Sequence, residues 1–73
     1  MPSIPETKAK NLHKILIKLG FKFREGEGSH RVYTHQDGRR TVISMHSKPL
    51  GKGLLKTILR QIQLTTNEFL DLS

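Results

Sequence analysis

The middle of the chain has the pattern of three short β-strands, and this constrains the fold more than any other feature. Residues 21–25 alternate apolar and charged side chains with a period of two, which is typical of a half-buried strand. Residues 29–35 form a second candidate strand, and residues 40–45 form a third that is rich in β-branched side chains. Because the connections are short and contain glycine, the strands are expected to form an antiparallel meander.

The first connection, residues 26–30, is the most distinctive stretch of the chain. Glycine adopts positive φ and permits close backbone approach, so Gly26 and Gly28 predict a tight turn that continues into Ser29. His30 follows at the rim of the second strand. An imidazole held there by a rigid turn is well placed to exchange protons near neutral pH. His30 is therefore the first candidate for a catalytic residue.

An amphipathic helix is expected before the strands. Apolar residues recur at helical spacing over residues 9–19, and Gly20 is placed to end the helix as a left-handed cap. Thr7 is one candidate N-cap, while Ser3 and Glu6 form a competing capping box one turn earlier. The pattern leaves both starts open.

Helical spacing returns after the strands. Residues 54–62 predict a second amphipathic helix. Thr65 and Glu68 then have the spacing of a capping box, and Leu64 and Phe69 have that of a hydrophobic staple. A short third helix is therefore expected to follow, up to about residue 72.

The order of elements predicts an α+β fold. Phe21 and Phe23 are expected to bury one face of a three-stranded antiparallel sheet, with helices covering that same face. The resulting α-β-β-β-α order, followed by the short helix, has the outline of a double-stranded-RNA-binding domain. We expect one domain over residues 1–73, with residues 1–6 as a loose lead-in.

The charge balance implies an anionic partner. Lysine and arginine number 13 against 6 acidic residues, which gives a net charge of +7. Nucleic acid, an anionic membrane surface and an acidic protein all fit such a charge. There is no cysteine, which excludes disulfides and thiolate chemistry. No apolar run suggests a signal peptide or a membrane span, so the expected location is the cytoplasm.

Six short motifs follow one another along the chain: Leu19-Gly20-Phe21, Gly28-Ser29-His30, Asp37-Gly38-Arg39, Met45-His46, Leu50-Gly51-Lys52-Gly53 and Glu68-Phe69-Leu70. In this order and spacing the sequence resembles the HicA (YcfA-like) family of mRNA interferase toxins, over nearly its whole length. One departure is Lys8, where family members often have a serine cap. This departure concerns only the start of the first helix.

The resemblance implies a function. HicA proteins are the toxin components of type II toxin–antitoxin systems: small ribonucleases with a double-stranded-RNA-binding-like fold, silenced by a HicB antitoxin. Their catalytic histidine is that of the Gly-Ser-His motif, which corresponds to His30 here. A neutral imidazole could take the proton of a ribose 2′-hydroxyl, and this chemistry needs no metal or cofactor.

Each histidine also has a purely structural interpretation. His30 could simply hydrogen-bond the turn, and strand parity places it on the face of Val32, so its exposure depends on lying at the rim. His46 is either a second proton-transfer or phosphate-binding group or an ordinary loop residue, and both interpretations remain open. His13 and His35 are expected to be plain surface residues. No metal site is expected, because nearby cysteines and carboxylates that could complete a tetrahedral set are lacking.

Basic residues are expected to supply the RNA-binding surface, although each is equally well explained as a solvated charge. Gly51-Lys52-Gly53 could present backbone N–H groups and an ammonium to a phosphate at a helix start. The six candidates are Arg24, Arg31, Arg39, Arg40, Lys48 and Lys52. The sequence thus favours a metal-independent endoribonuclease toxin; the alternatives are a non-catalytic RNA-binding module and a basic adaptor for an acidic protein.

Overall fold

The computed structural model describes residues 4–72. In this part of the chain, helices and strands follow the order α1, β1, β2, β3, α2, α3. Their bounds are α1 Ala9–Lys18, β1 Lys22–Glu25, β2 His30–Thr34, β3 Arg40–Ser44, α2 Lys52–Gln61 and α3 Thr66–Leu72. The predicted α+β class, with the element order of a double-stranded-RNA-binding domain, is confirmed.

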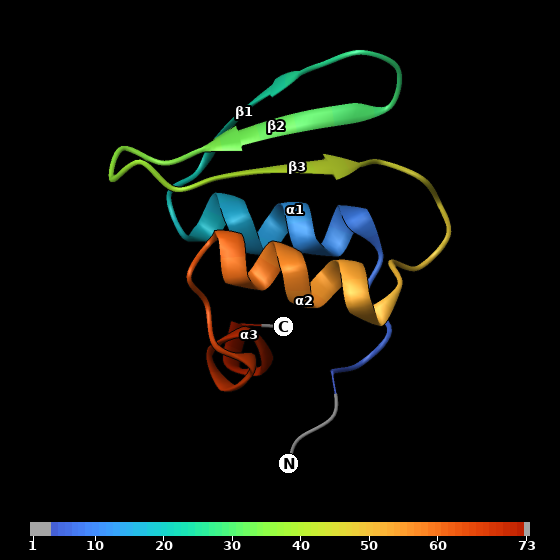
Figure 1. Ribbon diagram of the computed structural model, residues 1–73, viewed down its shortest axis with the longest axis vertical. Coiled ribbons are helices and arrows are strands. Elements are labelled where there is room, and N and C mark those ends of the chain that lie inside the picture. The colour runs from blue at the N-terminus through green and yellow to red at the C-terminus, as the bar shows by residue number, and fades with distance from the viewer. Residues whose placement is uncertain (1–3, 73) are drawn as a thin grey trace.

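The helices lie on one side of the sheet. Figure 1 shows α1 and α2 side by side against one face of the sheet, with α3 on the side of the helices away from it. The strands are ordered β1-β2-β3, and both pairs are antiparallel. Within residues 4–72 no helix covers the opposite face, which is the arrangement that the sequence predicts.

The strand register decides which side chains meet the helices. Tyr33 of β2 lies opposite Thr41 of β3, and the two are 0% and 2% exposed, so their shared face points toward α1 and α2. Because side chains alternate along a strand, Val32 and its partners Arg24 and Val42 lie on the helix-free face. The register therefore decides, for each strand residue of the candidate site, whether its side chain lies on the helix side or on the helix-free face.

Only one of the two phenylalanines expected in the core is buried. Phe21, just before β1, is 3% exposed, whereas Phe23 is 43% exposed. Phe23 does lie on the helix side, opposite Tyr33, but β1 is an edge strand and has a paired strand on one side only. Its ring packs against the ring of His13 from α1, with centroids 4.7 Å apart. The prediction that Phe23 buries the sheet face is therefore wrong.

The core lies between the sheet and the helices. Its largest fully buried apolar side chains come from helices and strands alike: Leu12, Leu16, Tyr33, Ile43, Leu55, Ile58, Ile62 and Phe69. Phe69 brings α3 into this cluster and so attaches the last helix to the rest of the domain. Ile4, within the segment expected to be a loose lead-in, is 6% exposed and belongs to the same cluster.

The ends of α1 differ in how well they were predicted. Lys8 is the N-cap residue, and its side chain makes no capping hydrogen bond. Thr7 instead donates from Oγ1 to the Pro5 carbonyl at 3.0 Å, so the prediction of Thr7 as the N-cap is wrong. Ser3, the competing cap, lies outside the described residues. Gly20 has a φ of +94°, which confirms the left-handed cap.

The start of α3 has the predicted capping box. Glu68 Oε1 accepts from the Thr65 N–H at 3.0 Å, and Thr65 Oγ1 accepts from the Glu68 N–H at 3.1 Å. Leu64 and Phe69, the expected staple, are both buried. Across residues 4–72, none of the helices combines the length and the apolar character that crossing a membrane requires.

Candidate active site at one end of the sheet

The glycine turn between β1 and β2 holds the backbone of His30 on both sides. The His30 N–H donates to the Glu27 carbonyl at 3.1 Å, and the His30 carbonyl accepts from the Gly26 N–H at 2.8 Å. Gly28 has a φ of +60°, a conformation that L side chains rarely adopt, so this position favours glycine. Gly26 does not have a positive φ. The turn is therefore tight, as predicted, and it fixes the backbone position from which the His30 imidazole projects.

The His30 ring is exposed, and one of its nitrogens is engaged. Nδ1 lies 3.1 Å from the Glu27 carbonyl oxygen. Because a carbonyl oxygen can only accept, Nδ1 carries the hydrogen in this bond, and the neutral ring keeps its lone pair on Nε2. The structural hydrogen bond and a role in proton transfer are thus compatible: the turn selects the tautomer in which Nε2 is the base.

The parity of His30 does not bury it. His30 shares its face with Val32, as expected, but this is the face without helices, and Ser44 of β3 lies directly opposite His30. Val32 is nevertheless only 8% exposed, since it lies between Arg24 and Val42 in the sheet and close to the turn at Gly26. The exposure of His30 therefore comes both from this open face and from its position at the strand end.

The end of β3 is fastened to the same turn. The Met45 N–H donates to the Ser29 carbonyl at 2.9 Å, and the hydroxyl oxygens of Ser29 and Ser44 are 3.1 Å apart. His46 follows directly and is exposed. The structure therefore brings His30 and His46 to the same end of the sheet, where β2 begins and β3 ends.

Two lysines that sequence reasoning did not select lie beside His46. A hollow of about 250 Å³ is lined by Lys8 and Lys10 together with His46 and its neighbours Met45 and Ser47. The sequence pattern shows these lysines only as polar positions at the start of a helix. Both lysines are 36 or more positions away from His46 in the sequence. They meet it because the start of α1 lies beside the loop after β3, and no local sequence signal could have shown this.

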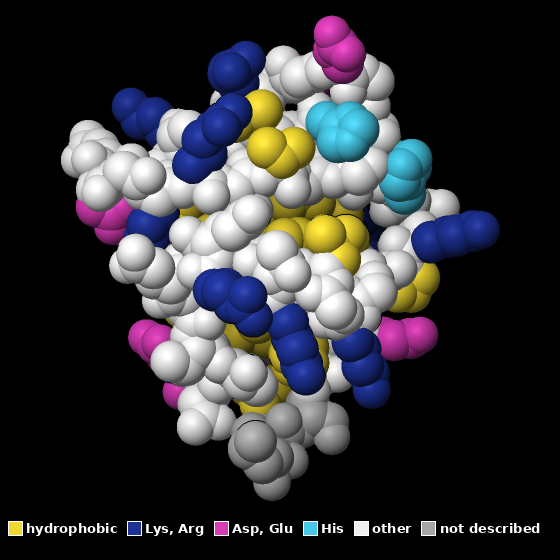
Figure 2. Space-filling model, in the orientation of Figure 1, with side chains coloured by type: hydrophobic (Ala, Val, Ile, Leu, Met, Phe, Trp, Pro, Cys, Tyr) yellow, Lys and Arg dark blue, Asp and Glu magenta, His cyan; other side chains and the backbone are white. Residues whose placement is uncertain are grey.

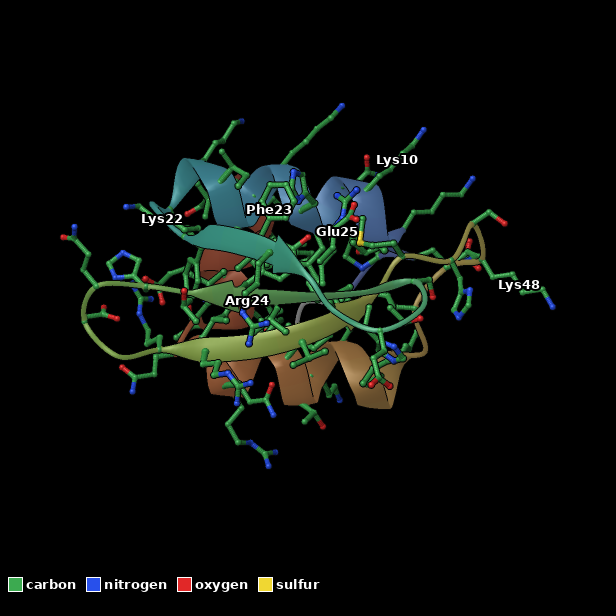
Figure 3. The ribbon with its side chains drawn as sticks, turned by 90° about the horizontal axis from the view of Figure 1, so that it is seen from above. Lys10, Lys22, Phe23, Arg24, Glu25 and Lys48 are labelled. Atoms are coloured by element: carbon green, nitrogen blue, oxygen red, sulfur yellow. The ribbon has the colours of Figure 1, made fainter. Side chains whose placement is uncertain are left out.

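The six basic residues predicted to bind RNA do not form one patch. Figure 3 looks onto the helix-free face and shows Arg24 over the sheet and Lys48 beyond one end of it. Lys52 is the first residue of α2 and is exposed. Arg40 lies opposite Thr34, at the end of the sheet away from the His30–Ser44 pair. Arg24, Lys48 and Lys52 are therefore the predicted residues best placed around His30.

Arg31 and Arg39 have structural partners. The Arg39 guanidinium donates to the Ile62 carbonyl at 2.7 Å and to Asp37 at 2.8 Å, and it lies over the Phe21 ring. Arg31, on the helix side of β2, lies over the Phe23 ring with its guanidinium carbon 5.0 Å from the ring centroid. These contacts account for the positions of both side chains without RNA.

Neither His13 nor His35 is a plain surface residue. His35 Nε2 donates to the Leu19 carbonyl at 3.1 Å, and its Nδ1 accepts from the Asp37 N–H at 3.2 Å. The Nδ1 of His13 lies 2.7 Å from the Tyr33 hydroxyl. Burial, together with the nearby positive charge of Arg31, lowers the pKa of His13 below its ordinary value of 6.5. The His13 ring thus helps to hold α1 against the sheet, and the His35 ring helps to hold the end of α1.

The fold and this site define a class of protein: a small basic domain with the element order of a double-stranded-RNA-binding domain and an exposed histidine held by a glycine turn. Within residues 4–72 no group of three or more His, Cys, Asp or Glu residues could hold a metal ion. A family model described as "HicA toxin of bacterial toxin-antitoxin" matches residues 9–64. The chain belongs to this family of toxins. No curated protein sequence matches it.

Proposed function

We propose that the protein is a metal-independent endoribonuclease toxin that cleaves mRNA in the cytoplasm with His30 and is silenced by a HicB-type antitoxin. The observation that carries this proposal is the state of His30: the ring is exposed, its backbone is fixed on both sides, and its Nδ1 is committed to the Glu27 carbonyl. Membership of the HicA toxin family supports the same function.

The chemistry needs one base and one acid. Nε2 of His30 accepts the proton of a ribose 2′-hydroxyl, and the 2′-oxygen bonds to the adjacent phosphorus. The bond from phosphorus to the 5′-oxygen breaks, which leaves a 2′,3′-cyclic phosphate and a 5′-oxygen that takes up a proton. His46, at the same end of the sheet, is the candidate donor of that proton. Because the protein has only to accept one proton and donate another while the phosphorus exchanges one oxygen for the other, this step requires no metal or cofactor.

Phosphates on either side of the cleaved bond are held by basic side chains near this end. Arg24 on the open face, Lys48 in the loop after β3 and Lys52 at the start of α2 are the nearest of the predicted set. Lys8 and Lys10 line the hollow beside His46 and extend the same surface. Arg31, Arg39 and Arg40 contribute at most to the general positive field, since the first two have structural partners and Arg40 is distant.

A second candidate function is a non-catalytic RNA-binding module of the same fold. The observation that favours it is the spread of charge: Lys56 and Arg60 extend the positive charge along α2 beyond Lys52. Figure 2 shows basic side chains on this part of the surface, away from the histidines. A module of this kind would bind RNA over a broad surface and leave it intact.

Incubation with defined RNA in the presence of EDTA distinguishes the two functions. The parental protein should produce fragments, and His30→Gln should slow cleavage by roughly 10²–10⁴-fold because a general base is lost. RNA binding should persist, and the free energy of unfolding should change by no more than about 0.5 kcal/mol, because the ring is exposed.

Glu27→Gln is the matched control, since it changes the same turn but keeps the carbonyl that His30 contacts. It should cleave at close to the parental rate. A parental protein that binds RNA without cutting it would favour the binding module. If His30→Gln cleaves normally, the base lies elsewhere, and His46→Gln becomes the decisive variant.

A further inference from the structure

The two edges of the sheet differ in how well they are protected from pairing with another chain. Exposed edge strands in natural proteins are kept short and charged, or are interrupted by proline or bulges. β1 follows this rule, with four residues of which Lys22, Arg24 and Glu25 are charged. β3 does not: it has five residues in continuous register, no proline, and a single charge at Arg40. β3 is therefore the unprotected edge.

Backbone hydrogen-bonding groups point outward along β3. The Met45 N–H bonds to Ser29, and the carbonyl of Arg39 accepts from His35, so these odd-numbered positions face β2. Hydrogen bonds alternate along an antiparallel strand. The N–H and C=O groups of Arg40, Val42 and Ser44 consequently point away from β2 and have no partner strand among the described residues.

A groove runs beside this edge. It lies between β3 and α2, has a volume of about 670 Å³, and is lined by Arg40 and Val42 on the strand and by Leu54 and Thr57 on the helix. Val42 is 41% exposed on the open face, and Leu54 is 51% exposed on the helix side. Figure 2 shows hydrophobic side chains exposed between the sheet and α2. A strand added beside β3 would cover apolar groups on both of its faces.

We propose that this edge binds an extended, acidic segment of a protein partner as a fourth strand of the sheet. The backbone groups of Arg40, Val42 and Ser44 supply the hydrogen bonds of strand addition, and Val42 and Leu54 supply contacts for alternate side chains of the segment. Arg40 is exposed at the rim of the groove and makes no ion pair within residues 4–72, so an acidic side chain complements it.

Charge and apolar surface argue against the two other occupants, a second copy of this chain and RNA. A second copy of this chain would bring two domains of net charge +7 together along the groove. RNA would satisfy the charge but would leave Val42 and Leu54 without apolar partners. The inference rests on the proposed function, because the partner it specifies is the antitoxin. Since β3 ends at Ser44, opposite His30, an antitoxin paired along this edge reaches the candidate active site.

A proline substitution tests strand addition directly. The Val42 N–H points outward, so Val42→Pro removes a donor for the partner while the ladder to β2 keeps its hydrogen bonds. Glu25→Pro is the matched control: Gly26 bonds inward to His30, so the Glu25 N–H also points outward, but on β1. Val42→Pro should weaken binding of the cognate antitoxin by tenfold or more, and Glu25→Pro should leave it unchanged.

A second pair of variants tests the same binding site without a proline substitution. Leu54→Asn should weaken antitoxin binding several-fold, whereas Ile17→Asn, on α1 with 44% exposure, should not. Both positions are exposed, so both proteins should fold. In the parental complex, the amide hydrogens of Arg40, Val42 and Ser44 should exchange more slowly than in the free protein, measured by NMR.

The outcomes separate this inference from the proposed function. If antitoxin binds both Val42→Pro and Leu54→Asn at parental affinity, or if the three β3 amides remain unprotected in the complex, strand addition is overturned and the toxin function stands. Protection of these amides by RNA instead of the antitoxin also overturns it. A parental protein that binds no antitoxin at all refutes the partner in the proposed function, and the inference with it.

Discussion

A contact between the side chains of His13, in α1, and Tyr33, in β2, joins this helix to the sheet. The His13 Nδ1 and the Tyr33 hydroxyl are 2.7 Å apart, and the same hydroxyl donates to the Met45 sulfur at 3.8 Å. Burial raises the pKa of Tyr33, so the phenol remains protonated and able to donate. Because its one hydrogen is donated to Met45, the hydroxyl accepts from the Nδ1–H of His13. Burial and the nearby positive charge of Arg31 favour the neutral form of this imidazole.

Stability should consequently fall as the solution becomes acidic. The pKa of His13 is lowered from 6.5 in the folded state, so the unfolded chain binds the proton more readily. The stabilisation is fully present above the unfolded value and is lost as pH falls through the folded value. Melting temperatures at about pH 7.5 and about pH 5.5 should therefore differ less for His13→Gln than for the parental protein. If the melting temperatures of the two proteins change equally between these pH values, protonation of His13 does not contribute to the pH dependence of stability.

At the scale of elements, short helices and tight turns are held by local hydrogen bonds. α3 has only seven residues, fewer than an isolated helix needs, and depends on its capping box and on Phe69 in the core. The hydrogen bonds from the backbone and hydroxyl of Thr65 lower the pKa of Glu68 below its ordinary value of 4.5. The cap therefore works with an ionised carboxylate at neutral pH.

Removal of the cap should destabilise the domain measurably. Thr65→Ala loses the hydroxyl that accepts from the Glu68 N–H and should cost about 1 kcal/mol in the free energy of unfolding. For a domain of this size that corresponds to a fall of roughly 4–8 °C in melting temperature. Thr66→Ala, one residue further along, is the control and should change the melting temperature much less. Equal shifts for the two variants would contradict the role of the capping box.

At the scale of the whole molecule, positive charge is distributed over several surfaces. Arg24 lies on the open face, Lys48 beyond one end of the sheet, and further basic side chains along α2 (Figures 2 and 3). RNA wrapped around the end that contains His30 meets only part of this charge. Proposed contacts with Arg24, Lys48 and Lys52, and one contact from the neighbouring pair Lys8 and Lys10, would release counterions from about four phosphates.

The salt dependence of RNA affinity measures the number of phosphate contacts. Four phosphate contacts on single-stranded RNA predict a fall of about 50-fold in affinity between about 50 and 200 mM salt. Lys48→Gln should reduce the slope of log affinity against log salt by about 0.7. Lys14→Gln, on the outer side of α1, is the charge-matched control and should leave the slope unchanged. An affinity that does not depend on salt would refute binding through this basic surface.

The amino-acid sequence by itself determined the elements, their order and the turns that join them. Period-two alternation, helical spacing, the positive φ of Gly20 and Gly28 and the capping box of α3 are local properties, so residues close in sequence specify them. The same local reasoning found the candidate His30, since its turn lies within five residues. It failed at Thr7, where the hydroxyl bonds back to Pro5 instead of capping α1.

Only the tertiary structure decided what each face and end of the sheet contains. Arg39 bonds to Ile62, 23 residues away, and His13 meets Tyr33, 20 residues away. Such contacts form when the helices pack against the sheet, and no local pattern encodes them. For the same reason the exposure of Phe23, the hollow beside His46 and the unprotected edge of β3 followed only from the packed domain, because each depends on which segments the fold leaves without a neighbour.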